Sequence, residues 1–181
     1  MSEVSDEELM RRYVADGSRE SFEFLFQRYA GRLQAMFMRR VRSREVAADL
    51  LQQTFMNFHR ARKDFQHGRL VRPWIYTIAL NVRREYGRQR LRKKEVSLDP
   101  VAHGEPAVGP DTTTPSDRLV RRALATLTEQ QREVIFLHWY EGLSFPEISI
   151  VVGASLSAVK VRAHRGYEAL RKLLGDEGGN R

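Results

Sequence analysis

The sequence predicts an all-α protein in which two small helical domains are joined by a flexible linker. Apolar residues recur at helical spacing along most of the chain, and no segment alternates apolar and polar residues over the length of a strand. Four of the six prolines lie together between residues 95 and 115, beside several glycines and threonines. We therefore predict a first domain over residues 1–94, a linker over 95–115, a second domain over 116–174 and a tail over 175–181.

The first domain is predicted to contain helices that each carry an apolar stripe. A short helix over residues 5–16 ends at Asp16-Gly17, and a longer amphipathic helix covers about residues 20–40. Ser43 is placed to cap the third helix, and the fourth begins at about Pro73. The stripes of the third and fourth helices are Ala47, Leu50, Leu51, Phe55 and Phe58, then Trp74, Ile75, Ile78, Ala79, Val82 and Tyr86.

Two capping boxes mark helix starts in the second domain, at Thr128–Gln131 and Ser144–Glu147. In each box the two end side chains can satisfy backbone N–H groups that have no partner within the helix. Gly153 is predicted to end the second of these helices because it can adopt a positive φ. Ser157 is predicted to cap the last helix. A helix, a tight turn and a basic helix together form a helix-turn-helix motif.

The last helix has an apolar face and a basic face. In a helix-turn-helix the second helix enters the major groove of DNA, which favours a DNA-reading function. The motif alone leaves open an ordinary helical hairpin with a solvated basic face. The apolar side holds Val159, Ala163, Gly166, Leu170 and Leu173, whereas the other side holds Lys160, Val161, His164 and Arg165, with Arg162 at the margin.

Charge is distributed unevenly along the chain, which has a formal net charge of +8. Residues 60–94 hold 12 basic and 2 acidic residues and so carry +10, whereas the first 25 residues carry −4. This asymmetry is typical of a polyanion-binding surface beside a face with another purpose.

Composition excludes several classes of function. The chain has no cysteines, and its five histidines lack metal-ligand spacing, so we expect no metal or cofactor and no catalytic site. No apolar run approaches the ~18 residues of a membrane span, and the acidic N-terminus does not resemble a signal peptide. We expect a cytoplasmic protein that is not an enzyme, with no small-molecule substrate and no direct insertion into a membrane.

Three segments, followed by the helix-turn-helix, together resemble a family. Ala47–Phe55 (AADLLQQTF), Trp74–Asn81 (WIYTIALN) and Leu127–Ile135 (LTEQQREVI) are similar to bacterial RNA polymerase sigma factors of the sigma-70 family, in the extracytoplasmic-function (ECF) group. The resemblance covers about residues 8–94 as sigma region 2 and 116–174 as region 4. It implies a transcription initiation factor that binds core RNA polymerase at the β′ clamp and the β flap, directs it to specific promoters and promotes DNA melting. It also implies an anti-sigma factor that covers these surfaces until a signal arrives.

The resemblance implies that one helix binds the coiled-coil clamp of the polymerase β′ subunit. The matching positions combine polar groups with an aromatic anchor, as an interface does. Gln53 departs from the family, where an acidic residue is common, which puts its contribution in doubt. Core packing is the alternative for the apolar members of this helix, and we interpret Leu51 as core. The matching positions are Asp49, Gln52, Gln53 and Phe55.

The resemblance assigns the Lys63–Arg72 loop and the helix from Trp74 to the downstream promoter element, where a base is flipped out of the melting duplex. Capturing single-stranded DNA requires cationic backbone contacts and aromatic or shaped surfaces for unstacked bases. Trp74 also lies on an apolar stripe, so core packing remains open for it. The residues assigned here are Phe65, Arg69, Arg72, Trp74, Asn81, Arg83, Arg84 and Arg88.

The basic face of the last helix would read the upstream promoter element. Arg162 and Arg165 are the candidates for bidentate contact with guanine, and Val161 can contact a thymine methyl group. The residues assigned to upstream DNA are Ser157, Lys160, Val161, Arg162, His164 and Arg165.

Two other functions remain as alternatives. A stand-alone helix-turn-helix regulator would need symmetric half-sites and a dimer interface, and the sequence shows no obvious dimerisation stripe. A helical adaptor that binds only proteins is disfavoured by the +10 segment and the basic last helix.

The linker favours two DNA-reading modules, because about 20 extended residues span at most ~65–70 Å. That reach equals about 20 base pairs at ~3.4 Å each.

Overall fold

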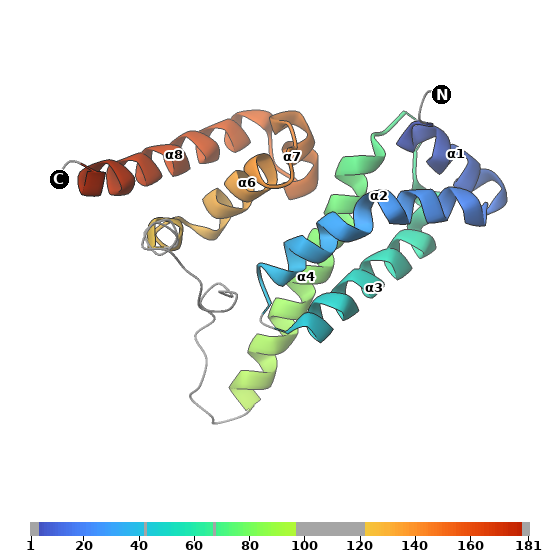
Figure 1. Cartoon of the computed structure of the whole chain (residues 1–181), viewed down its shortest axis with the longest axis horizontal. Helices are drawn as coiled ribbons and strands as arrows, with labels where there is room; N and C mark the ends of the chain where they lie inside the picture. The colour runs from blue at the N-terminus through green and yellow to red at the C-terminus, as the bar shows by residue number, and fades with distance from the viewer. Residues whose placement is uncertain (1–3, 42, 67, 97–121, 179–181) are drawn as a thin grey trace. The chain divides into compact units, whose positions relative to one another are not determined.

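The computed structural model describes residues 4–41, 43–66, 68–96 and 122–178, and every regular element in these ranges is a helix (Figure 1). This confirms the predicted all-α fold. The chain divides into two compact units, residues 1–109 and 110–181. No helix among the described residues is long and apolar enough to cross a membrane.

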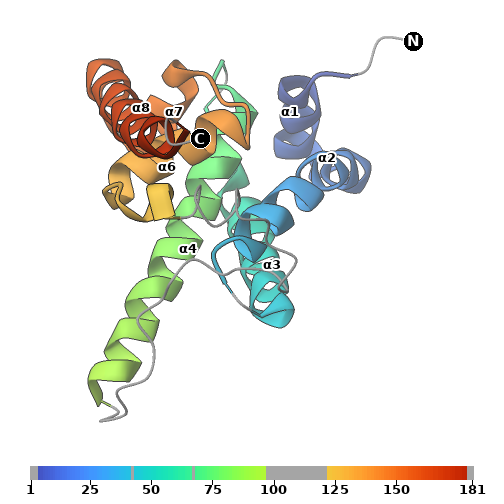
Figure 2. The ribbon, with the colours of Figure 1, turned by 60° about the vertical axis from the view of Figure 1, so that its left-hand side comes forward.

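The N-terminal unit contains four α-helices and one short 3-10 helix among its described residues. In sequence order α1 packs on α2, α2 on α3 and α3 on α4, and α1 also contacts α4 (Figure 2). The elements are α1 (Asp6–Asp16), α2 (Arg19–Met38), α3 (Arg44–Arg60), η1 (Ala61–Asp64) and α4 (Val71–Val96).

Local sequence signals account for most of these boundaries. Ser18 and Ser43 cap α2 and α3, where each side chain accepts a backbone N–H three residues on. Gly17 ends α1 with φ 72°, as predicted. Helix α4 begins at Val71, two residues before the predicted start at Pro73. Proline is tolerated there because the first N–H groups of a helix have no partner within it.

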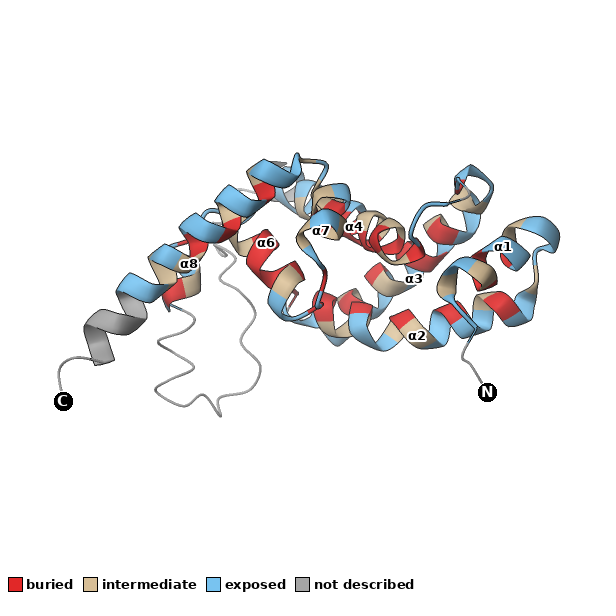
Figure 3. Ribbon diagram, turned by 90° about the horizontal axis from the view of Figure 1, so that it is seen from above, coloured by how far each residue is buried: buried red, intermediate tan, exposed pale blue. Residues whose placement is uncertain are grey.

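The core of the N-terminal unit lies between the facing sides of α2, α3 and α4, where Figure 3 shows the buried residues. The predicted stripe of α4 includes Ile75 but omits Tyr76 and Leu80, which are also fully buried. The largest fully buried side chains of the unit come from all four α-helices. They are Met10, Leu25, Leu33, Met36, Phe37, Phe58, Ile75, Tyr76 and Leu80.

The C-terminal unit is built on three described helices: α6 (Glu129–Trp139), α7 (Phe145–Val152) and α8 (Leu156–Gly178). Both predicted capping boxes are present, at the starts of α6 and α7. Gly153 ends α7 with φ 65°, also as predicted.

The predicted cap of α8 is wrong by two residues. The hydroxyl of Ser155, not that of Ser157, accepts the backbone N–H of Ala158 at 3.2 Å. A capping hydroxyl must precede the helix and reach the third N–H, whereas Ser157 already lies within the first turn. The Ser157 hydroxyl lies 3.0 Å from that of Ser155 instead.

Helix α8 packs closely along α6 and α7. Val159 and Ala163 are buried on its inner face. At Gly166 a Cβ atom would lie 2.5 Å from the Cδ1 atom of Ile135, so the absence of a side chain permits this approach of α8 to α6. The predicted faces of the last helix are therefore confirmed where the structure describes its side chains, and Leu173 lies outside that range.

The predicted linker, residues 95–115, lies outside the described residues except for Glu95 and Val96, which are the last two residues of α4. The structure also describes a short helical stretch before α6, at residues 122–125.

Candidate functional site

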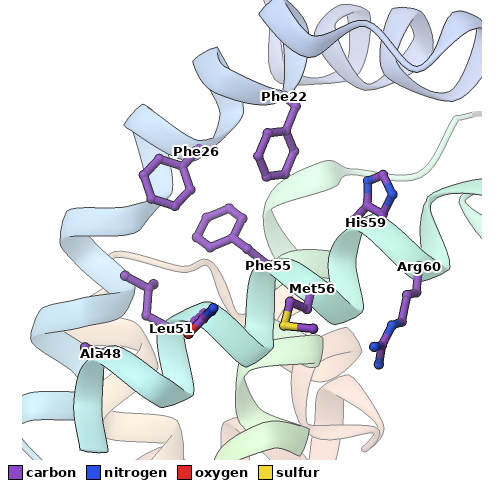
Figure 4. Close-up of a pocket in the computed structure, with 9 residues that line it drawn as sticks. Phe22, Phe26, Ala48, Leu51, Phe55, Met56, His59 and Arg60 are labelled. Carbon is purple, nitrogen blue, oxygen red and sulfur yellow. The ribbon is translucent and has the colours of Figure 1, made fainter. Parts of the chain in front are cut away.

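An apolar groove lies between α2 and α3 on the surface of the N-terminal unit. Its volume is about 420 Å³. Figure 4 shows the rings of Phe22 and Phe26, from α2, directed toward Phe55 on α3. The ring centroids of Phe26 and Phe55 are 4.6 Å apart. The groove is lined by Phe22, Phe26, Ala48, Leu51, Gln52, Phe55, Met56, His59 and Arg60.

Of the four residues predicted to bind the polymerase, Gln52 and Phe55 line this groove, and Asp49 and Gln53 lie on α3 outside its lining. Asp49, Gln52 and Gln53 are exposed along α3, and the Gln53 amide donates a hydrogen bond to Asn57 at 2.9 Å. Phe55 is only 5% exposed, so it forms the floor of the groove and does not protrude as an anchor. Leu51, which we interpreted as core, is half-buried and lines the groove.

The α2 side of the groove is absent from the sequence-based assignment. Phe26 on α2 and Met56 on α3 are 40% and 41% exposed, a large exposure for apolar side chains. The available signal was the pair Phe22 and Phe26, which are four residues apart and so share one side of α2. An apolar patch that the core does not need marks an interaction surface.

The segment between η1 and α4 combines exposed and buried members of the predicted DNA set. Arg69 is exposed and Arg72 is half-buried. Phe65 is 8% exposed, and its ring centroid lies 5.0 Å from that of Trp74. Trp74 is half-buried, with Phe58 also 5.0 Å away. The prediction that Phe65 presents a surface to unstacked bases is not supported, because the aromatic core covers its ring.

Along α4 the predicted DNA-binding residues differ in exposure. Asn81 and Arg88 are exposed and Arg84 is half-buried. Arg83 is only 8% exposed, because it follows Ala79 by four residues on the core-facing side, so its assignment as a phosphate contact is not supported. Arg88 forms an ion pair with Glu85 at 2.6 Å, and the hydrogen bond from Arg88 lowers the pKa of Glu85.

The outer face of α8 carries the predicted upstream DNA-binding residues together. Arg162 is half-buried at the margin, as predicted, and Val161 is 47% exposed. His164 lies 3.5 Å from Glu168, measured from its Nε2 atom to Oε1. The exposed members of the set are Ser157, Lys160, Val161, His164 and Arg165.

An exposed tryptophan beside α8 was not identified from the sequence. Trp139, the last residue of α6, is 71% exposed, and its indole N–H donates a hydrogen bond to the Tyr167 hydroxyl at 2.9 Å. Tyr140, the next residue, is 55% exposed.

Comparison with known proteins identifies the family. Residues 25–93 match the family model for Sigma-70 region 2, and residues 117–170 match the model for Sigma-70, region 4. The RNA polymerase sigma factor CarQ from Myxococcus xanthus is 40% identical over 167 residues, which cover 89% of this chain and 93% of CarQ. The chain belongs to the sigma-70 family. The match to region 2 favours a sigma factor over a stand-alone helix-turn-helix regulator, which would account for region 4 alone.

Other relatives place this sigma factor in the ECF group. The ECF RNA polymerase sigma factor SigW of Bacillus subtilis is 27% identical over 179 residues, 91% of this chain and 95% of SigW. This sigma factor is a transcription initiation factor of the ECF type. No group of three or more potential metal ligands occurs among its described residues.

Two solved structures resemble the chain along most of its length. CnrH, in complex with the cytosolic domain of CnrY, has a TM-score of 0.69 at 27% identity and covers 94% of this chain and 97% of CnrH. The sigma factor RpoE from Bartonella quintana, in complex with the anti-sigma factor NepR, has a TM-score of 0.71 at 25% identity. That match covers 86% of this chain and 98% of RpoE.

Proposed function

We propose that this sigma factor binds the β′ clamp of core RNA polymerase with the groove between α2 and α3 and the exposed face of α3 beside it. The observation that carries this proposal is the open apolar groove with the polar side chains of Asp49 and Gln52 beside it. Interfaces combine an apolar centre with a polar rim in this way. Phe26 and Met56 add apolar area, and Phe55 supports the floor.

The downstream promoter element is assigned to the segment before α4 and to the exposed face of α4. Arg69 would hold the backbone of the separated strand, and Asn81 would bind an unstacked base through its amide. Arg84 and Arg88 would contribute phosphate contacts, which raise affinity and salt dependence without selecting sequence. Trp74 would support this surface from its inner side, because the rings of Phe58 and Phe65 pack against it.

The upstream promoter element is assigned to the outer face of α8. Arg165 is the principal candidate for contact with guanine because its side chain is exposed. Arg162 is half-buried at the margin of this face, so it would approach the DNA major groove from one side. Lys160 and His164 would contact phosphates or base edges, and Val161 a thymine methyl group. An anti-sigma factor would keep this sigma factor inactive until a signal arrives. The complexes of CnrH with CnrY and of RpoE with NepR support this proposal.

Two further assignments are the contact with the β flap of the polymerase and the cellular location of the protein. The C-terminal unit would also contact the β flap, the second polymerase element that the family resemblance implies. Because polymerase and promoter DNA are its partners, we assign the protein to the cytoplasm, with sequestration by an anti-sigma factor as a means of control.

Run-off transcription tests the proposal as a whole. Core polymerase should initiate from a subset of a genomic promoter library only when this chain is added. Core polymerase alone provides the control. Initiation that is indifferent to the chain would contradict promoter direction, and repression of initiation would support the stand-alone regulator.

Promoter opening should fail when Arg69 and Asn81 are both replaced by alanine. Both side chains are exposed, so the fold should remain, and binding of the holoenzyme to duplex promoter should persist through α8. Permanganate reactivity of unpaired thymines measures the opening. The variant Arg19→Ala, which removes an exposed arginine on α2, is the control. Normal opening by the double variant would refute base capture by these residues.

A further inference from the structure

Helix α1 contacts both ends of the connection between α3 and α4, whose described residues are 61–66 and 68–70. This helix lies before residue 25, where the match to the region 2 family model begins. At the α3 end, the Tyr13 hydroxyl lies 2.5 Å from the Nδ1 atom of His59, and the Tyr13 ring is 2% exposed. The guanidinium carbon of Arg62, within η1, lies 5.8 Å from the centre of the same ring.

At the α4 end, the contact is made by an acidic side chain from the first turn of α1. The backbone N–H of Val71, the first residue of α4, donates a hydrogen bond to Oε1 of Glu7 at 3.3 Å. Leu70, which precedes the helix, has no side-chain acceptor of its own. Glu7 therefore acts as a cap from 64 residues away in sequence, and its negative charge faces the positive end of the helix dipole.

Helix α1 is itself held firmly on α2. The Asp6 carboxylate accepts a hydrogen bond from the Tyr29 hydroxyl and forms an ion pair with Arg28, with both charged side chains less than a quarter exposed. Arg28 also donates to the carbonyl oxygen of Val4 at 2.6 Å. Burial and the Asp6 hydrogen bond raise the pKa of Tyr29.

We infer that α1 is a brace for the 61–70 connection, in which Glu7 and Tyr13 are positioning residues for downstream promoter recognition. The inference rests on the proposed function, since the connection contains Arg69, which is proposed to contact the separated DNA strand. Gln66, Arg69 and Leu70 are exposed and receive little support from the core. With only one end held, the connection would occupy more conformations, and the fraction competent to bind a flipped base would fall.

Amide hydrogen exchange on the free protein tests the brace without DNA. Glu7→Ala should speed exchange at the first amides of α4 by about fivefold, a typical effect of losing a helix cap. Glu7→Gln should restore most of the protection, because its amide oxygen still accepts the Val71 N–H. Glu20→Ala, which removes an exposed acid from α2, is the charge-matched control. Wild-type exchange in Glu7→Ala would overturn the brace.

Promoter opening by the holoenzyme tests the purpose of the brace. Glu7→Ala should slow opening by about fivefold and reduce discrimination against a substituted downstream base, with unchanged affinity for core polymerase. Tyr13→Phe, which keeps the ring and removes the contact with His59, should act in the same direction. Wild-type opening and discrimination in both variants would overturn the inference. Failure of base capture itself would appear separately, as normal opening by the Arg69 and Asn81 double variant.

Discussion

Replacing Asp49 with arginine is expected to weaken binding to core RNA polymerase by roughly 100-fold, about 3 kcal/mol, since a reversed charge in an interface costs several kcal/mol. Asp49 is exposed on α3 beside the groove, so the substitution should leave the fold and the helical circular dichroism unchanged. Affinity can be measured by titrating core polymerase into labelled sigma factor.

Glu20→Arg reverses the charge of an exposed acid on α2 and serves as the control for net charge. Equal affinity of Asp49→Arg and wild type would exclude this face of α3 from the clamp interface. Phe55→Ala would be a poor substitute for this test. Phe55 is 5% exposed and contacts three other phenylalanine rings. Its truncation should cost about 3–5 kcal/mol of stability.

Replacing Arg165 with alanine is expected to relax base preference at one position of the upstream element. A bidentate contact between arginine and guanine contributes about 1–3 kcal/mol of discrimination, which is roughly 5- to 150-fold in relative affinity. Arg165 is exposed on the outer face of α8, so its truncation should leave the fold unchanged. Competitive binding of the holoenzyme to a randomised upstream element measures the preference.

Arg171, an exposed arginine six residues further along α8, provides the matched control. If it contacts phosphate, Arg171→Ala should weaken binding to all sequences about equally and reduce the salt dependence by about one charge. An unaltered sequence profile for Arg165→Ala would show that another side chain reads the upstream bases. In that case half-buried Arg162 would be the next candidate, from the margin of the same face.

The predictions that the structure confirms concern short stretches of sequence. Gly17 ends α1 and Ser43 caps α3 because each acts on backbone groups within four residues. The faces of α8 follow from the period of 3.6 residues, as buried Val159 and exposed Arg165 show. The misplaced cap at Ser157 is an error of the same local kind, since two serines lie two residues apart and only the structure shows which hydroxyl is used.

Two of the residues assigned to DNA are buried, although the chemistry of their side chains suits DNA. Phe65 suits a stacking surface by type, but its ring packs on Trp74. Arg83 suits a phosphate contact by charge, but it continues the inner face of α4 after Ala79. Both residues were chosen by side-chain type within the segment that the family resemblance indicated, and side-chain type does not distinguish a residue that touches DNA from one that supports its neighbours.

The sequence by itself determined the α-helices, most of their caps, the helix-turn-helix and the basic character of the surfaces assigned to DNA. Each of these depends on periodicity, on capping within one turn or on charge, all of which are readable along the chain. Only the tertiary structure decided that Phe26 and Phe55 share a groove and that Glu7 caps α4. These pairs come from different helices, and the exposure of a side chain depends on whichever distant element packs against it.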